Sequence, residues 1–423
     1  MGIGNLPDGW TLSTLGEIAD LIGGGTPSRE HPEYFTGNHV WLTPTEIPHN
    51  RVTVVSTSRE KITDEGLKKS SARLLPKGTV LMTSRASIGY VAIAGTEVTT
   101  NQGFASFICK DGVYNHFLAY WLLGNADYFV EQATGTTFKE ITKSKLRNFS
   151  FPLPPLPEQG RIVAKIEELF TQLDAGTAAL KRVRAGLKRY KASVLKAAVE
   201  GKLLESRGIE NSDELPDGWI WATVAELAAK EPYSITDGPF GSKLKTEHYT
   251  DVGPRVMRLQ NIGEGEFRDA KAHISQEHFE TLKRHRIYAG DLVIAGLGES
   301  LPRACIIPDY VGDAIVKADC IRLKPNSQIA DAKYLLFALN SETIKKLVAK
   351  IVHGIGRPRM NQQEIKAIPI PLPPLSEQRR IVAEVERRLS VAQEVESVVA
   401  ASVARAGRLR QSVLKNAFEG KLQ

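Results

Sequence analysis

The sequence lacks most of the signatures that assign a chain to a class of enzyme. It has only three cysteines, without a CxxC pair, and nine histidines without HExxH or another ligand-like spacing. Such spacing disfavours a structural zinc site and a disulfide framework, so we expect Cys109, Cys305 and Cys320 to be small apolar fillers that stay reduced. No GxxxxGKS/T, GxGxxG or GxSxG motif occurs. We therefore expect a chain that is not itself a catalyst and binds no metal and no cofactor.

The sequence is also poor in long hydrophobic runs. No stretch of 18 apolar residues occurs, and the N-terminal "MGIGNLPDGW" lacks a basic segment followed by an apolar one. Neither a membrane partner nor a signal peptide is indicated, so the expected location is the cytoplasm. The chain has 423 residues, of which 42% are hydrophobic and 24% charged. It is too long for one ordinary hydrophobic core, so we expect two or more globular domains. Its net charge of +7 favours a polyanionic partner.

What the sequence does contain is a long internal repeat. The stretches "FPLPPLPEQGRIV" and "IPLPPLSEQRRIV" share ten of 13 aligned residues, 219 positions apart. Because a repeat marks a repeated structural unit, we expect two copies of one unit, each a variable segment followed by a stiff, extended Pro-rich lead-in and a helix. The paired landmarks are "LPDGW" (from Leu6 and Leu215), the lead-ins (from Phe151 and Ile370) and the "EGKL" ends (from Glu200 and Glu419).

Apolar residues at alternating three- and four-residue steps follow each lead-in. The pattern predicts two helices of roughly 44 residues, about 65 Å long, that end at Gly201 and Gly420. Ser376 is the expected N-cap of the second. Because a solitary helix of this length would expose its apolar stripe, we expect the two helices to pair with each other in antiparallel orientation. The predicted pairing residues are Ile162, Ile166, Leu169, Leu173, Leu180, Val183, Leu187 and Val194 in the first helix, and Ile381, Val385, Val395, Val399, Leu409 and Val413 in the second.

Short β-branched runs bounded by Gly, Pro and Asn fill the two variable segments, which predicts small mixed domains with irregular loops. The segments share only echoes such as "LLPKGTVLM" and "IYAGDLVIA", each of which predicts a turn that leads into a short apolar strand. We therefore expect one fold that carries two different surfaces. The predicted fold class is α/β (α+β), with two globular domains separated by two long antiparallel coiled-coil helices in pseudo-two-fold symmetry. The predicted bounds are 1–155 and 204–374 for the domains, and 156–203 and 375–423 for the helices.

Several loops of the variable segments combine Arg, Lys, Asn, Gln, Thr or Ser with Gly. Lys and Arg contact phosphates, and the polar side chains hydrogen-bond base edges. For any single residue a turn or surface role is an equal alternative. The basic run "KRVRAGLKRYK" has two alternative roles. It either forms a solvated or protein-contacting face of the helix, or it binds DNA phosphates. The predicted DNA contacts are Thr43, Thr45, Ser84, Arg85, Asn101, Gln102 and Lys139 in the first domain, and Lys243, Lys245, Arg258, Gln260, Asn261, Arg303, Arg357, Arg359 and Asn361 in the second.

Nearly the whole chain resembles the specificity (S) subunit of type I restriction–modification systems. The resemblance is carried by both Pro-rich lead-ins, both "LPDGW" openings and both "EGKL" ends. Within the domains it is carried by "GGGTPS" with "VWLTPTEI", "SRASIGYVAI" with "TTNQGF", and "ITDGPFGSKLK" with "GIGRPRMNQQEIKAIPIPLPPL". These segments look like motifs of that family's target recognition domains.

The resemblance implies a non-catalytic chain that binds double-stranded DNA. Each domain would read one half of a bipartite, asymmetric target, and the helices would set the gap and dock two methyltransferase (M) subunits. The M subunits would methylate adenine at N6 with S-adenosylmethionine, and two restriction (R) subunits would use ATP and Mg²⁺. Two alternatives stay open. One is the S subunit of a type IIB-like restriction–modification enzyme, and the other is a coiled-coil scaffold whose domains bind proteins.

Overall fold

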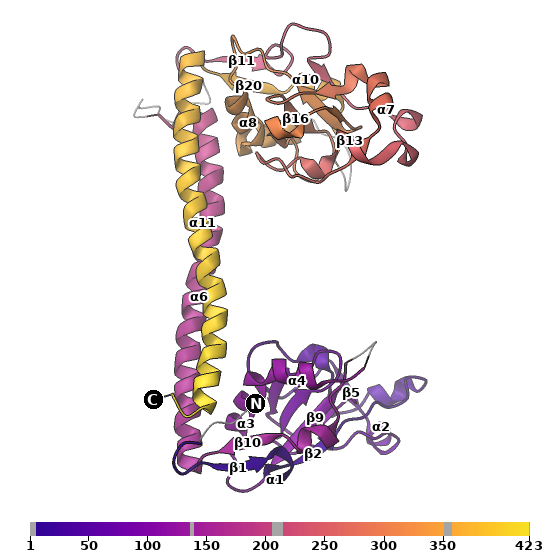
Figure 1. The fold of residues 1–423 in the computed structure, drawn as a ribbon, viewed down its shortest axis with the longest axis vertical. Helices are drawn as coiled ribbons and strands as arrows, with labels where there is room; N and C mark the ends of the chain where they lie inside the picture. The colour runs from indigo at the N-terminus through magenta and orange to yellow at the C-terminus, as the bar shows by residue number, and fades with distance from the viewer. Residues whose placement is uncertain (1–5, 136–138, 205–214, 351–357, 423) are drawn as a thin grey trace. The chain divides into compact units, whose positions relative to one another are not determined.

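The computed structural model describes residues 6–135, 139–204, 215–350 and 358–422. The chain divides into two compact units, Met1–Leu180 with Ala401–Gln423, and Lys181–Ala400. Each unit contains one globular domain and parts of two long helices, α6 (Leu156–Val199) and α11 (Leu375–Phe418) (Figure 1). The helices had been expected over 156–203 and 375–423. Mixed sheets, short helices and two 44-residue helices confirm the predicted fold class.

The first domain is built on a five-stranded sheet and a three-stranded sheet. The first has the order β2 (Ala19–Gly23), β9 (Phe104–Cys109), β6 (Val80–Thr83), β7 (Val91–Ala94), β4 (Thr53–Val55), and the second β5 (Glu60–Ile62), β3 (His39–Leu42), β8 (Thr99–Thr100). The helices are α1 (Leu15–Ile18), α2 (Asp64–Lys68), α3 (Asn115–Gly124), α4 (Ala126–Gln132) and α5 (Lys143–Arg147). Helix α3 contacts β6 and β7 and buries seven consecutive side chains, from Phe117 to Leu123, in the core.

The second domain has two four-stranded sheets. Their orders are β12 (Ile235–Thr236), β19 (Cys320–Leu323), β16 (Leu292–Ala295), β17 (Ala304–Ile306), and β14 (His273–Ile274), β13 (Tyr249–Met257), β18 (Ala314–Val316), β15 (Arg286–Ile287). The helices are α7 (Gln276–Thr281), α8 (Ala332–Asn340), α9 (Glu342–Ala349) and α10 (Gln362–Lys366).

Strands β6 and β16 begin with the same turn, as the sequence echo predicted. Gly78 and Gly290 stand two positions before them with φ of +91° and +83°, a conformation that glycine adopts without strain. The amide of Gly78 donates to Ala94 O at 2.8 Å, and that of Gly290 donates to Ile307 O at 2.9 Å. The two domains therefore share their central hairpin although their sequences differ.

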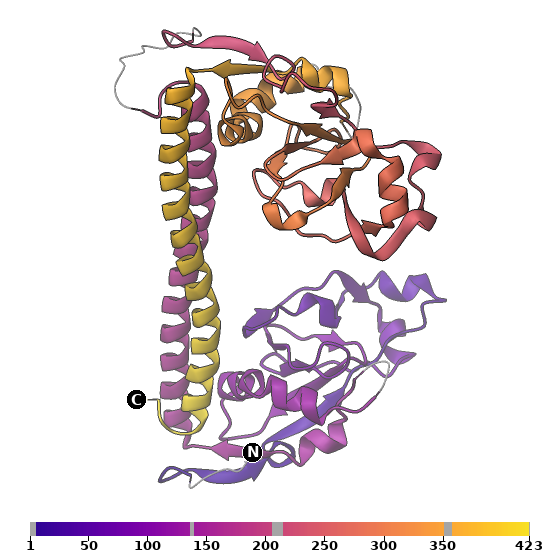
Figure 2. The same cartoon turned by 45° about the horizontal axis from the view of Figure 1, so that its top comes forward.

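Both Pro-rich lead-ins are extended, as expected, and both form the second strand of a two-stranded ribbon (Figure 2). In the first unit β1 (Thr11–Thr14) pairs antiparallel with β10 (Ser150–Leu153). In the second unit β11 (Ile220–Thr223) pairs antiparallel with β20 (Pro369–Leu372). Proline lacks an amide hydrogen and is tolerated at the edge of a sheet, which a two-stranded ribbon provides.

A buried glutamine closes the junction between the first lead-in and its helix. Gln159 lies in the first turn of α6 and is fully buried. Its Oε1 accepts from Tyr114 N at 2.8 Å, and its Nε2 donates to Gly112 O at 2.9 Å and to Pro154 O at 2.8 Å. One side chain thus joins the helix start, the lead-in and the loop before α3.

Gln378 makes the same three bonds in the second unit and is also fully buried. It accepts from Asp331 N at 2.8 Å and donates to Ile329 O at 2.9 Å and to Pro373 O at 2.8 Å. The prediction that Ser376 caps this helix is wrong. Helix α11 begins one residue earlier, so Ser376 lies exposed in its first turn.

Both long helices end at their C-termini as predicted, at a glycine. Gly201 and Gly420 follow the helices with φ of +69° and +71°. The next amides, Lys202 N and Lys421 N, return to carbonyls five residues back, at 2.9 and 2.8 Å. This is the hydrogen bond that ends a helix after a glycine in the left-handed conformation.

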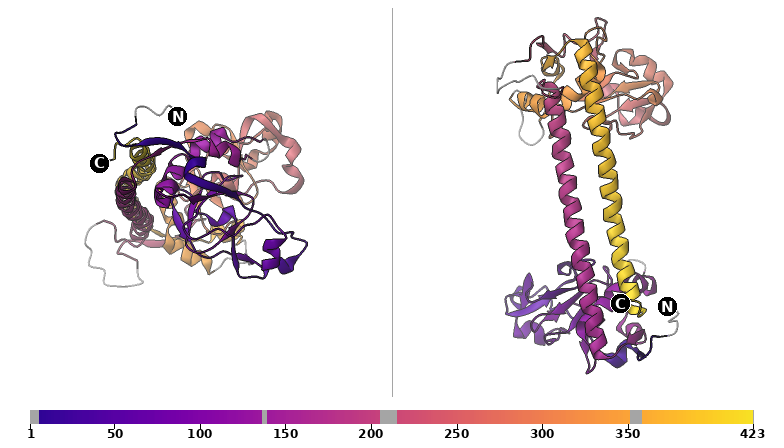
Figure 3. Two further views of the ribbon diagram at one scale, coloured as in Figure 1. Left: turned by 90° about the horizontal axis from the view of Figure 1, so that it is seen from below. Right: turned by 90° about the vertical axis from the view of Figure 1, so that its left-hand side faces the viewer.

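Helices α6 and α11 lie side by side and antiparallel within each unit (Figure 3). In the first unit Arg410 of α11 forms an ion pair with Asp174 of α6. In the second unit Lys191 of α6 forms an ion pair with Glu396 of α11. The partner's number on α11 falls as the number on α6 rises, which is the sign of antiparallel pairing.

The predicted pairing residues differ in their surroundings. Val183, Val395 and Leu409 are 44%, 38% and 42% exposed. Ile162 and Ile166 belong to the core of the first domain. The core of the second domain includes Val194, Ile381 and Val385. Val399 is buried, and the half-buried members are Leu169, Leu173, Leu180, Leu187 and Val413. The apolar stripe therefore serves the globular domains near the helix ends as well as the helix pair.

We predict that Gln378→Leu destabilises the second unit by at least about 3 kcal/mol. The substitution leaves the carbonyls of Ile329 and Pro373 and the amide of Asp331 without their partner, and each such group costs about 1–3 kcal/mol where it is kept from water. Gln393→Leu is the control, because Gln393 is exposed on the same helix, and it should change stability by no more than about 0.5 kcal/mol. Hydrogen exchange of peptides from the second domain across a urea series measures both. Equal stabilities would contradict the assigned role of Gln378.

The strand pairs β6–β9 and β16–β19 differ at one buried pair of residues. In the second domain Arg322 Nε lies 2.6 Å from Asp291 Oδ2, and both side chains are only 5% exposed. The registers β6–β9 and β16–β19 place Thr79 and Ser106 at the corresponding positions of the first domain, where both are buried. A buried ion pair in one copy thus replaces two hydroxyl side chains in the other.

We predict that Asp291→Asn destabilises the second domain by about 3–5 kcal/mol, because it leaves the Arg322 charge buried without a counter-charge. The double variant Asp291→Thr with Arg322→Met removes both charges and keeps volume, and it should recover most of that loss. The same hydrogen-exchange measurement follows both proteins. A double variant no more stable than Asp291→Asn would show that the pair is not the cause.

Candidate nucleic-acid interface

Three loops of the first domain, each directly after a strand, are joined to one another by backbone hydrogen bonds. Asn101 N, after β8, donates to Leu42 O at the end of β3 at 3.0 Å, and Ser84 N, after β6, donates to Gly103 O at 2.8 Å. The amide of Ala86 donates to Lys139 O at 3.0 Å, which adds the segment before α5. The predicted contact residues of this domain therefore come from loops that meet at one place.

Within this cluster some predicted side chains face outward and others do not. Thr45, Gln102 and Lys139 are exposed, whereas Ser84 is only 4% exposed. Arg85 Nε lies 3.9 Å from Glu140 Oε2, and both side chains are 45% exposed. The outward-facing members can reach a ligand without rearrangement, and the hydroxyl of Ser84 cannot.

Three members also orient the loops. Thr43 donates from its amide and its hydroxyl to Glu46 Oε2, at 2.8 and 2.9 Å. Asn101 Oδ1 accepts from Gly103 N at 2.9 Å. Gln102 accepts a hydrogen bond from Thr26, which connects the "GGGTPS" segment to the "TTNQGF" segment.

The second domain has the same backbone hydrogen bonds between loops at corresponding positions. Lys317 N donates to Met257 O at 2.8 Å, where the first domain has Asn101 N and Leu42 O. Gly296 N donates to Asp319 O and Met360 N donates to Gly296 O, both at 2.7 Å. The equivalent bonds in the first domain are Ser84 N to Gly103 O and Ile141 N to Ser84 O. Both domains thus bring corresponding loops together, with different side chains on them.

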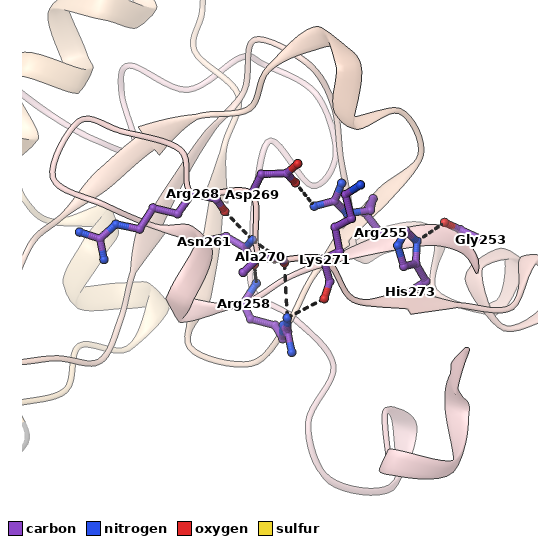
Figure 4. A network of polar contacts seen from close by, with 9 residues as sticks. All are labelled: Gly253, Arg255, Arg258, Asn261, Arg268, Asp269, Ala270, Lys271 and His273. Carbon is purple, nitrogen blue, oxygen red and sulfur yellow. Dashed lines mark hydrogen bonds and ion pairs between the residues drawn. The ribbon is translucent and has the colours of Figure 1, made fainter. Parts of the chain in front are cut away.

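Asn261, a predicted contact, lies inside this framework. It is fully buried, and its Nδ2 donates to Arg268 O at 2.8 Å and to Ala270 O at 2.9 Å (Figure 4). Its Oδ1 accepts from Arg258 N at 2.9 Å. Every strong polar group of this amide is therefore used within the protein, and the side chain shapes the loop instead of presenting a surface to a base.

The neighbouring arginines are likewise engaged with the protein. Arg258 Nη2 donates to Lys271 O at 3.0 Å, and Arg303 Nη2 donates to Leu259 O at 3.3 Å. Arg255, which is 7% exposed, is paired with Asp269, and this hydrogen bond holds the pKa of the Asp269 carboxyl below its ordinary value. The guanidinium groups of Arg255 and Arg258 hold the loop of residues 264–271 in place.

The loop they hold carries cations that the sequence prediction missed. Arg268 is exposed, and its side chain points away from the network in Figure 4. Lys271 of the same loop is exposed as well. The only signal in the sequence was a pair of basic residues shortly after "NIG", and nothing in it indicated that Arg258 and Asn261 would support the loop.

The remaining predicted contacts lie around the same cluster or before β13. Lys243, Lys245 and Gln260 are exposed. Lys245 N donates to His248 Nδ1 at 3.0 Å. The rings of His248 and His278 are stacked, with their centroids 4.0 Å apart. Asn361 caps α10 by accepting from Gln363 N and Glu364 N at 2.8 and 3.0 Å. Arg359 is exposed and paired with Asp319, and Arg357 lies outside the described residues.

The described part of the chain offers no group of three His, Cys, Asp or Glu residues that could hold a metal ion. Within the same residues no helix is long and apolar enough to cross a membrane. All three cysteines are free, and burial raises the pKa of Cys305 and of Cys320 to about 12. Thiols with so high a pKa are protonated at neutral pH and poor nucleophiles.

Comparison with known proteins gives consistent matches. The family model described as the type I restriction modification DNA specificity domain matches residues 7–183 and 271–389. The MjaIX specificity subunit of a type I restriction enzyme from Methanocaldococcus jannaschii is 26% identical over 379 residues, covering 88% of this chain and 85% of that protein. The EcoDI specificity subunit of Escherichia coli is 28% identical over 327 residues, covering 72% of this chain and 69% of that protein.

Two solved structures share the fold. A chain from a structural study of assembly and conformational transition of the type I R-M system superposes with a TM-score of 0.71 at 20% identity, covering 99% of this chain and 100% of that one. The HsdS subunit of Thermoanaerobacter tengcongensis superposes with a TM-score of 0.60 at 20% identity, covering 100% of this chain and 99% of that one. The matched family model spans more than half of the sequence, and the chain therefore belongs to the family of type I restriction–modification DNA specificity subunits.

Proposed function

We propose that each globular domain of this specificity subunit reads one half of a bipartite, asymmetric DNA target. The observation that supports the proposal is the pair of corresponding loop clusters. Each is built on the same backbone hydrogen bonds, yet one carries Thr45 and Glu140 where the other carries Gln260 and Arg359. A shared framework with different polar side chains is what two readers of different half-sites require.

The proposed partners are double-stranded DNA, two methyltransferase subunits and two restriction subunits, in the cytoplasm. Long helices fixed at their starts by Gln159 and Gln378 suit a spacer that sets the gap between half-sites and docks the methyltransferases. One helical turn of the duplex is about 34 Å long. A spacer of fixed length therefore sets the number of base pairs between the two half-sites.

In this proposal the chain contributes recognition and its partners contribute the chemistry. S-adenosylmethionine belongs to the methyltransferase subunits, which modify adenine at N6, and ATP with Mg²⁺ belongs to the restriction subunits. The exposed polar loops of this chain hold the duplex in register while a target adenine leaves the stack. The second candidate, the S subunit of a type IIB-like enzyme, keeps the same recognition role with other partners.

A protein-binding scaffold is the alternative that a salt titration separates. If the two loop clusters contact six to ten phosphates, affinity for random duplex should fall by roughly 10³- to 10⁵-fold between 50 and 200 mM salt. Lys243→Ala should reduce the slope of log affinity against log salt by about 1. Lys324→Ala, an exposed lysine paired with Glu231 in the same domain, is the control and should leave the slope unchanged. Weak, salt-independent DNA binding would favour the scaffold.

A further inference from the structure

We propose that Arg359 reads a guanine in the half-site of the second domain, and that Asp319 is the residue that positions it. This inference rests on the proposed function of that domain and goes beyond it by naming one base and the two side chains that select it. It separates Arg359 from the other arginines of the cluster, which the sequence alone did not distinguish.

Both residues are fixed by the backbone joints of the loop cluster. Gly296 N donates to Asp319 O and Met360 N donates to Gly296 O, each at 2.7 Å, and Leu297 and Arg359 form a β-bridge. Asp319 directly precedes β19, and Arg359 lies just before α10. The two side chains therefore start from rigid positions on opposite sides of the same loop.

In the part of the chain that the structure describes, Asp319 holds one edge of the guanidinium and the other edge makes no hydrogen bond. Nε and Nη2 of Arg359 lie 2.9 and 2.7 Å from Asp319 Oδ1. The guanidinium has five N–H donors, and this contact occupies the edge formed by Nε and Nη2. The edge formed by Nη1 and Nη2 keeps two parallel donors, which match O6 and N7 of guanine in the major groove.

Burial and order agree with this assignment. The Arg359 side chain is 57% exposed, whereas that of Asp319 is 21% exposed. A free arginine loses several rotatable bonds when it binds, and an arginine already held by a carboxylate loses fewer. Asp319 therefore holds the two parallel donors of Arg359 in position before the DNA binds.

Among the described residues of this region, three other arginines are engaged with the protein, and the exposed Arg268 lies on the separate loop of residues 264–271. Arg258 and Arg303 donate to backbone carbonyls of the protein, and Arg255 is 7% exposed. Arg359 instead borders a cavity of about 330 Å³ that is also lined by Phe240, Gln362 and the carboxylates of Asp237, Asp319 and Glu364. Two of these carboxylates are already paired within the protein, Asp319 with Arg359 and Glu364 with the amide of Asn361.

The first domain has a different group at this position. Its β-bridge corresponding to Leu297–Arg359 joins Arg85 and Glu140, so Glu140 stands where the second domain has Arg359. A carboxylate accepts hydrogen bonds and offers no fork to guanine. The inference therefore concerns only the half-site of the second domain.

Selection of randomised duplexes by the full-length chain, followed by sequencing, tests the assignment. The wild-type chain should prefer a G·C pair at a position of the second half-site. Arg359→Ala should reduce that preference by roughly 5- to 150-fold and leave the other positions intact. Arg359→Lys keeps the charge but removes the fork, and it should lose the preference while retaining more affinity than Arg359→Ala.

Two further comparisons separate positioning from mere stability. Asp319→Asn should weaken the same preference, and Lys324→Ala, at the opposite end of β19, should leave it unchanged. A duplex with 7-deazaguanine at that position lacks the N7 acceptor, so it should bind the wild-type chain more weakly but bind Arg359→Ala like the unmodified duplex. Thermal unfolding verifies that each variant is folded.

The outcomes distinguish the two levels of the proposal. A wild-type motif that Arg359→Ala and Arg359→Lys leave unchanged, or a loss of affinity equal for all sequences, would overturn the guanine assignment and leave DNA reading intact. A wild-type chain that selects no motif would overturn both.

Discussion

The rest of the structure depends on one buried glutamine at the start of each long helix. A helix start leaves backbone groups unpaired, and in both units a loop carbonyl, a loop amide and a lead-in carbonyl meet there. Gln159 and Gln378 pair all three, and no shorter or charged side chain offers one acceptor and two donors at that reach. This explains why "PLPPLPEQ" and "PLPPLSEQ" are nearly the same although the domains before them differ. The direction of each helix is thereby tied to its own domain.

On this fixed framework the two domains differ mainly in what the loop clusters display. In the first domain the turn after β3 is closed by Glu46, which accepts from the amide and hydroxyl of Thr43. In the second the corresponding turn is closed by Asn261, which also reaches over to the loop of residues 264–271. The same turn can therefore be closed by different acceptors, so the neighbouring exposed residues can vary without loss of the fold.

The sequence predicted the parts of this structure that local patterns determine. The repeat, the two helices, their glycine ends, the extended lead-ins and the turns before β6 and β16 all follow from spacing, glycine and proline. The sequence could not show which side of a loop a polar residue faces. Ser84 and Asn261 have suitable chemistry for a base contact, yet tertiary packing buries both. Arg268 was missed for the same reason, because its exposure depends on Arg258 and Asn261 beneath it. Ser376 was misplaced because the buried Gln378, rather than a capping hydroxyl, secures the start of α11.

The central claim is that reading lies in the loop clusters and that the ribbons, the buried glutamines and the helices form a common frame. The most direct measurement replaces residues 15–149 of the first domain with residues 224–368 of the second and keeps both long helices. The target of this chimera is then determined by sequencing the adenines methylated when it is expressed with its methyltransferase. The account predicts that the half-site of the second domain occurs twice, with the original gap. Persistence of the original first half-site in a folded chimera would contradict it, because recognition would then reside in the frame.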